Sequence, residues 1–103
     1  MGLNMKAKRT KACDISKRVK EKVWERDNHC CVICGSTSAM PNAHFIPRSK
    51  GGLGIEENII TLCNDCHRKF DQSDERIQIK QYLQNYLEMK YPCWNISNLV
   101  FKK

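Results

Sequence analysis

Two cysteine pairs, each with two residues between its members, constrain the fold of this short chain more than any other feature. The pairs are Cys31 with Cys34 and Cys63 with Cys66. Four thiolates at this spacing can close a tetrahedron around Zn²⁺. A chain of 103 residues has room for only a small core, and such chains often need a metal or disulfides to supplement burial. We therefore expect one domain held together by a structural zinc ion.

The remaining cysteines leave other interpretations open. The chain has seven cysteines, so a fully paired disulfide framework would leave one thiol over. Pairing Cys30 with Cys34 would give a three-residue gap, but the usual two-residue gap and Gly35 directly after Cys34 favour Cys31 as the ligand. Disulfides or buried free thiols are the competing interpretations of all four positions. Three cysteines are then left as small buried apolar side chains or idle thiols: Cys13, Cys30 and Cys93.

Composition indicates a cytoplasmic protein with a polyanionic partner. The start MGLNMKAKRTK has no apolar segment after its basic residues, which argues against a secretory signal. No apolar run approaches the roughly 20 residues that a membrane helix needs. Lys and Arg total 18 against 11 acidic residues, a net charge of +7. This balance favours nucleic acid as the partner, although a basic surface with no specific role would give the same charge.

Periodicity and turn residues predict an α+β domain. Residues 1–13 are basic and predict a flexible arm, and residues 14–103 form the expected domain. A helix capped by Asp14 or Ser16 should run to about Arg26. Short strands are expected at 43–46 and 58–62, with a glycine-rich loop between them. Helices should follow at 64–70 and 74–90, and the apolar residues of the tail should pack back on the core.

Three polar residues accompany the cysteine pairs in a set order. Two of them lie between the two pairs, and the third directly follows the last cysteine. They are His44 in AHFIPRSKGG, Asn58 in EENIITLC and His67 in CNDCHRKFD. With the two cysteine pairs, this order resembles the HNH endonuclease family over roughly residues 17–71. The resemblance implies a ββα-metal (His-Me finger) core at about 43–71, stapled by zinc and flanked by helices. It also implies a metal-dependent hydrolysis of DNA phosphodiester bonds.

The resemblance implies a role for each residue of this motif. His44 matches the general base, and its ordinary pKa near ~6.5 leaves it neutral at physiological pH. Asn58 has no proton to exchange, so we expect it to orient the base and tie the loop. His67 and Asp71 are four residues apart on one helical face, where they could hold Mg²⁺, Mn²⁺, Ni²⁺ or Co²⁺. Many family members have a metal-binding Asp or His before the base, whereas this chain has Ala43. Two outcomes stay open: Asp71 supplies the missing ligand, or the metal is held weakly or activity is lost.

Arg48 and Lys50 are the expected DNA phosphate contacts, because they flank the loop after His44. Two other functions stay open. A zinc-knuckle module could bind nucleic acid without cutting it, and a redox protein could cycle the thiols of its CxxC pairs. Small proteins of this build occur in bacteriophages and bacterial genomes, some linked to DNA packaging. Neither a homodimer nor a packaging partner can be read from the residues.

Overall fold

A two-stranded antiparallel sheet forms the centre of the molecule. In this computed structural model, residues 9–102 are described. Strand β1 (Ala39–His44) pairs with β2 (Ile59–Cys63), with His44 opposite Ile59 and Ala39 opposite Cys63. The register shifts between Met40 and Ala43, where Pro41 has no N–H to donate to its neighbour. The strands therefore pair on both sides of a local irregularity, and this irregularity accommodates Pro41.

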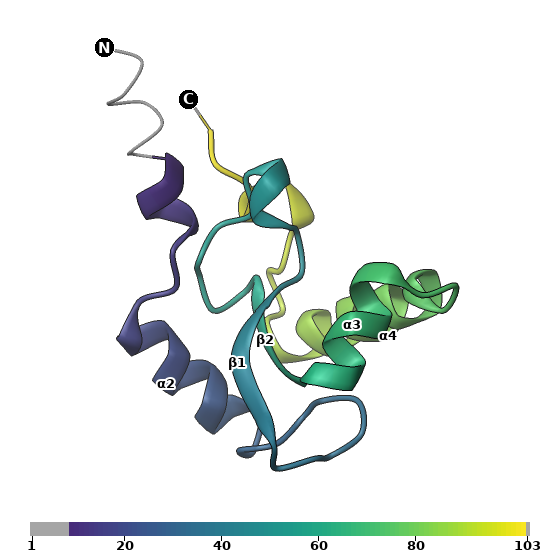
Figure 1. Ribbon diagram of the computed structural model, residues 1–103. Coiled ribbons are helices and arrows are strands. Elements are labelled where there is room, and N and C mark those ends of the chain that lie inside the picture. The colour runs from purple at the N-terminus through teal and green to yellow at the C-terminus, as the bar shows by residue number, and fades with distance from the viewer. Residues whose placement is uncertain (1–8, 103) are drawn as a thin grey trace.

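Helices cover the sheet from two sides (Figure 1). Helix α2 (Lys17–Arg26) lies beside the strands on one side, and its first turn is capped by Ser16 Oγ, which accepts from Val19 N at 3.2 Å. Helix α3 (Asn64–Gln72) follows β2 directly, and α4 (Arg76–Lys90) packs against α3 on the other side. The sheet and α3 are thus a ββα unit, and the domain is a small α+β fold.

The core lies between the sheet, α3 and α4. Every residue of β2 is buried, because the strand is covered on both faces. The tail completes this core: Trp94 Nε1 donates to the carbonyl of Glu57 at 2.8 Å, and Val100 forms a bridge with Gly52. The buried members of the cluster are Cys31, Ala43, Phe45, Ile46, Ile60, Leu62, Cys63, Cys66, Leu83, Leu87 and Leu99. The expected packing of the tail is therefore present.

A buried ion pair ties α2 to the open edge of β2. Arg26 Nε and Nη2 donate to the two carboxylate oxygens of Asp27 at 2.7 and 3.0 Å. Asp27 also accepts from Thr61 N at 2.9 Å and from the hydroxyl of Tyr86 at 2.6 Å. The carboxylate therefore satisfies the N–H of Thr61 at this edge, and its buried charge is fully paired.

Several expected boundaries differ from the structure: the second strand spans 59–63 rather than 58–62, and the helix after it runs to Gln72 rather than to 70. The first strand spans 39–44 rather than 43–46, because pairing with β2 extends it back through Pro41. The last helix begins at Arg76 rather than at 74, and its N-cap position is Glu75. Residues 9–13 of the expected arm are helical, and Cys13 is buried. Residues 1–8 of that arm lie outside the described part of the chain.

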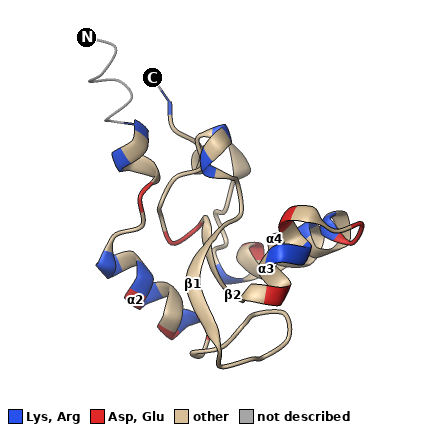
Figure 2. Ribbon diagram, viewed as in Figure 1, with Lys and Arg blue, Asp and Glu red and all other residues tan. Residues whose placement is uncertain are grey.

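Basic residues are spread along α2 and in the short 3-10 helix at Arg48–Lys50 (Figure 2). Within residues 9–102, none of the helices is both long and apolar enough to span a bilayer.

Candidate active site and metal centre

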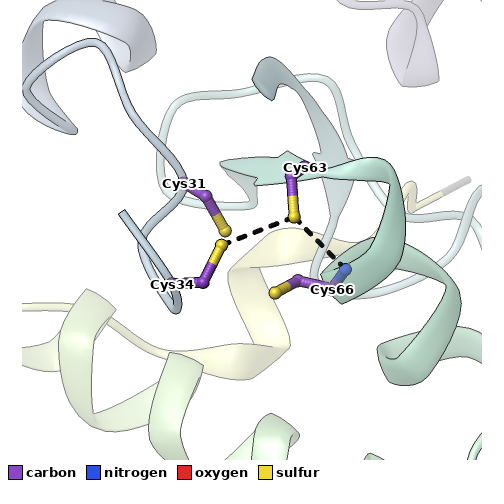
Figure 3. Close-up of side chains that lie close together, drawn as sticks. All are labelled: Cys31, Cys34, Cys63 and Cys66. Atoms are coloured by element: carbon purple, nitrogen blue, oxygen red, sulfur yellow. Dashed lines mark hydrogen bonds between the residues drawn. The ribbon is translucent and has the colours of Figure 1, made fainter. Parts of the chain in front are cut away.

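Four cysteine sulfurs converge at one end of the sheet (Figure 3). Cys31 and Cys34 lie in the turn after α2, Cys63 ends β2, and Cys66 lies in the first turn of α3. All four sulfurs lie within 4.8 Å of one another, and those of Cys34 and Cys63 are 3.6 Å apart. A tetrahedral site with Zn–S bonds of about 2.3 Å places its sulfurs about 3.8 Å apart. The cluster therefore has the size and the donor set of a site that can hold a metal ion such as Zn²⁺.

Backbone geometry around the cluster suits thiolate ligands. Gly35 follows Cys34 with a φ of +78°, a turn that favours glycine. Cys66 N donates to the sulfur of Cys63 at 3.4 Å. Cys30 lies outside the cluster, where its thiol faces the carbonyl of Asp27 at 3.5 Å. The spacing of the first pair is therefore Cys31-x2-Cys34.

His44 stands at the end of β1, half-buried beside the N-terminal segment. Its Nε2 lies 2.8 Å from the carbonyl oxygen of Cys13. A carbonyl can only accept, so Nε2 carries the proton and the neutral ring keeps its lone pair on Nδ1. Burial is the largest effect and lowers the pKa of His44; the hydrogen bond to the Cys13 carbonyl is the next largest and raises it, and the nearby positive charge of Arg48 lowers it again, so the net shift is downward. The ring is therefore neutral at physiological pH.

Asn58 is fully buried and holds the two ends of the loop that joins the strands. Its Oδ1 accepts from Ile46 N at 2.8 Å. Its Nδ2 donates to the carbonyls of Ile46 at 3.2 Å and Leu53 at 2.8 Å. The backbone carbonyl of Asn58 also accepts from Phe45 N at 2.8 Å, next to His44. The residue therefore fixes the backbone on which His44 is carried.

His67 and Asp71 project from the same face of α3. His67 Nε2 lies 3.6 Å from Asp71 Oδ2, and their side chains are 34% and 57% exposed. Asp71 and His44 line one hollow of about 450 Å³, with Phe45 and Phe70 among its other lining residues. His44 and Asp71 thus share one surface depression, and His67 lies beside Asp71 on α3.

Ala43, the residue before His44, does not line this hollow. Ala43 is fully buried and belongs to the core cluster. Side chains alternate across a strand, so a residue at 43 faces the core while His44 faces outward. A metal near His44 would therefore depend on α3 for its protein ligands.

The two expected DNA contacts differ in their surroundings. Arg48 Nη2 forms an ion pair of 2.6 Å with Asp14, and its Nη1 donates to the carbonyl of Cys13 at 3.2 Å. Lys50 is exposed and lines the same hollow as His44. Lys50 is therefore available to a ligand there, whereas Arg48 is already engaged with the N-terminal segment.

The sequence did not reveal that the N-terminal segment orients His44. The group that contacts His44 is a backbone carbonyl, which has no side-chain signature. Gly54 carries the one available signal: its N–H donates to the carbonyl of Ala12 at 3.0 Å, and a Cβ there would lie 2.0 Å from the carbonyl oxygen of Asp14. Only glycine permits this close approach of the segment to the loop.

Comparison with known proteins agrees with this geometry. Residues 31–83, just over half of the chain, match the family described as HNH endonuclease. A protein named Anaredoxin from Nostoc sp. is 28% identical over 67 residues, which cover 64% of this chain and 88% of that protein. The family match includes all four clustered cysteines as well as His44, Asn58 and His67. The chain belongs to the HNH endonuclease family.

Proposed function

We propose that the protein is a metal-dependent DNA endonuclease that hydrolyses a phosphodiester bond in the hollow lined by His44 and Asp71. The observation that carries this proposal is the position of a neutral imidazole beside a His–carboxylate pair, all carried on one ββα unit. Family membership supports the reaction class. The cytoplasm, where thiols stay reduced, is the proposed setting.

His44 is proposed as the general base. With Nε2 donating to the Cys13 carbonyl, Nδ1 is the atom that takes a proton from the attacking water. The same hydrogen bond fixes the orientation of the ring and strengthens as the imidazolium forms. Asn58 acts as a positioning residue, because it holds the backbone on either side of the loop.

His67 and Asp71 are proposed to hold the catalytic cation. An imidazole and a carboxylate one helical turn apart suit Mg²⁺, Mn²⁺ or Ni²⁺, and they leave most coordination positions open for water and phosphate. When bound, such an ion neutralises charge on the phosphate and on the leaving oxygen. The four-cysteine site is proposed to hold Zn²⁺ for architecture alone, because four thiolates fill its coordination sphere.

Two other functions make different predictions. A nucleic-acid-binding module without catalysis is favoured by the absence of a ligand at Ala43, and it predicts DNA binding with no cleavage under any divalent metal. A redox function is suggested by the name of the Nostoc relative. It predicts a protein without zinc whose thiols cycle, whereas convergence of four thiols in one cluster favours a metal.

Nicking of supercoiled plasmid tests the proposal. Wild type is assayed with Mg²⁺, Mn²⁺ or Ni²⁺ beside His44→Ala, with zinc content and melting temperature measured for both. His29→Ala is the matched control, because His29 is exposed and pairs with Glu25 at 2.9 Å rather than with any residue of the hollow. We expect metal-dependent nicking by wild type and His29→Ala, and none by His44→Ala with its fold and zinc intact. Equal nicking by all three proteins would contradict the assignment of the base.

A further inference from the structure

The far wall of the hollow is formed by the start of α4, which the motif does not include. Arg76, Ile77 and Lys80 line the hollow together with His44 and Asp71. Lys50 lines it from the loop after β1. The wall is therefore built from a helix that lies beyond the ββα unit in sequence.

The charge of this hollow is not balanced by the protein. Among the described residues that line it, three cations accompany one carboxylate, Asp71. The ion pairs found within residues 9–102 use other basic groups, such as Arg26 with Asp27 and Arg48 with Asp14, and include none of these three cations. Lys50, Arg76 and Lys80 are all exposed. The hollow thus offers an anion three positive groups that no carboxylate of the described chain neutralises.

The spacing of the two helical cations suits an extended polyanion. Arg76 and Lys80 are one helical turn apart, about 6 Å along the axis, and so share a face of α4. Ile77, next to Arg76, is 74% exposed although it lines a polar hollow. An exposed isoleucine among cations fits a ligand that carries both phosphates and apolar sugar or base surface.

We propose that Arg76 and Lys80, together with Lys50, bind phosphates of the DNA strand that is cut, and that Ile77 packs against a deoxyribose or base of that strand. The inference rests on the proposed function, because it assigns the substrate contacts of the same hollow. Phosphate contacts position the strand without reading sequence. Helix α4 is then the part of the fold that places the scissile phosphate beside His44.

Salt dependence of DNA binding tests the two cations. Binding of a fluorescein-labelled 20-base-pair duplex is followed by anisotropy at increasing NaCl, with no divalent metal added. Each lost phosphate contact reduces the slope of log K against log[NaCl] by about 0.9. Arg76→Gln/Lys80→Gln should therefore flatten the slope by about 1.8 and weaken binding at least tenfold at low salt. Lys20→Gln/Lys90→Gln removes the same charge outside the hollow and should keep the wild-type slope.

The apolar contact is tested separately, because it releases no counterions. Ile77→Gln should weaken binding roughly three- to tenfold at every salt concentration and leave the slope unchanged. Met89→Gln is the control, since Met89 is 72% exposed on the same helix outside the hollow. All variants change exposed residues, and zinc content verifies that they are folded.

Different failures contradict different statements. Equal slopes for the two double variants would overturn the phosphate contacts while leaving the proposed nuclease function in place. Equal affinities for Ile77→Gln and Met89→Gln would overturn the apolar contact. If wild type does not bind DNA at all, both this inference and the proposed function fail.

Discussion

Replacing Asn58 should destabilise the protein far more than replacing any exposed asparagine. Asn58→Ala leaves the N–H of Ile46 and the carbonyls of Ile46 and Leu53 without their partner. A buried group that loses its hydrogen bond costs about 1–3 kcal/mol, so the three groups together cost at least about 3 kcal/mol. This is a large part of the roughly 5–15 kcal/mol that keeps a domain folded.

Urea unfolding of the zinc-loaded protein, followed by tryptophan fluorescence, measures this loss. With a slope of about 1–1.5 kcal/mol per molar urea, the midpoint should fall by at least about 2 M. Asn58→Asp keeps the shape of the side chain but directs a buried carboxylate at two carbonyl oxygens, so it should be at least as unstable at neutral pH. Its deficit should shrink as pH falls, because burial raises the pKa of that carboxyl in the folded state.

The control is Asn42→Ala, at an exposed position in β1, which should change stability by less than about 0.5 kcal/mol. A loss below about 1 kcal/mol for Asn58→Ala would refute the view that this side chain fixes the loop.

Three further predictions follow from the contacts of the site. Gly54→Ala should displace the N-terminal segment from the loop, because its Cβ would lie 2.0 Å from the Asp14 carbonyl oxygen, and should lower nicking rates at least tenfold with zinc retained. The acidic limb of the pH–rate profile should lie below pH 6.5, because burial lowers the pKa of His44, and Arg48→Gln should move it to higher pH by removing a nearby positive charge. Cys63→Ser should lose zinc and melt at lower temperature, measured by mass spectrometry and calorimetry; full zinc content would contradict its role as a ligand.

The metal cluster was predictable from sequence because its information is local. Each CxxC pair is a single turn, and Gly35 marks the spacing of the first pair. The order of His44, Asn58 and His67 likewise indicated the ββα unit, since His44 ends β1, Asn58 directly precedes β2 and His67 lies on α3. Residue type and spacing are sufficient to identify such residues.

The parts that were missed depend on contacts between distant segments. Strand β1 runs through Met40 and Pro41, which have no strong strand preference, because β2 supplies the partner. The segment before Asp14 reads as a basic arm, yet its backbone binds Gly54 and His44. Every residue has a backbone carbonyl, so residue type does not predict which carbonyl makes such a contact. The folded structure is needed to identify it.

The wall formed by α4 was missed for a similar reason. Arg76 and Lys80 look like ordinary surface charges in a helical pattern. Their position beside His44 follows from the packing of α4 on α3, which sequence periodicity does not specify. Arg48 was one of the two phosphate contacts expected from proximity in sequence, and in the structure it forms an ion pair with Asp14.

Two separate metal centres, one structural and one catalytic, are the feature on which the proposed function depends. The most direct test is Mn²⁺ titration of the zinc-loaded protein, with free Mn²⁺ followed by electron paramagnetic resonance and zinc measured in parallel. Wild type and His44→Ala should bind Mn²⁺ and keep their zinc, whereas His67→Ala/Asp71→Ala should keep zinc and lose Mn²⁺ binding. Mn²⁺ that binds only by displacing zinc, or that binds the double variant as well as wild type, would contradict the separation of the two centres.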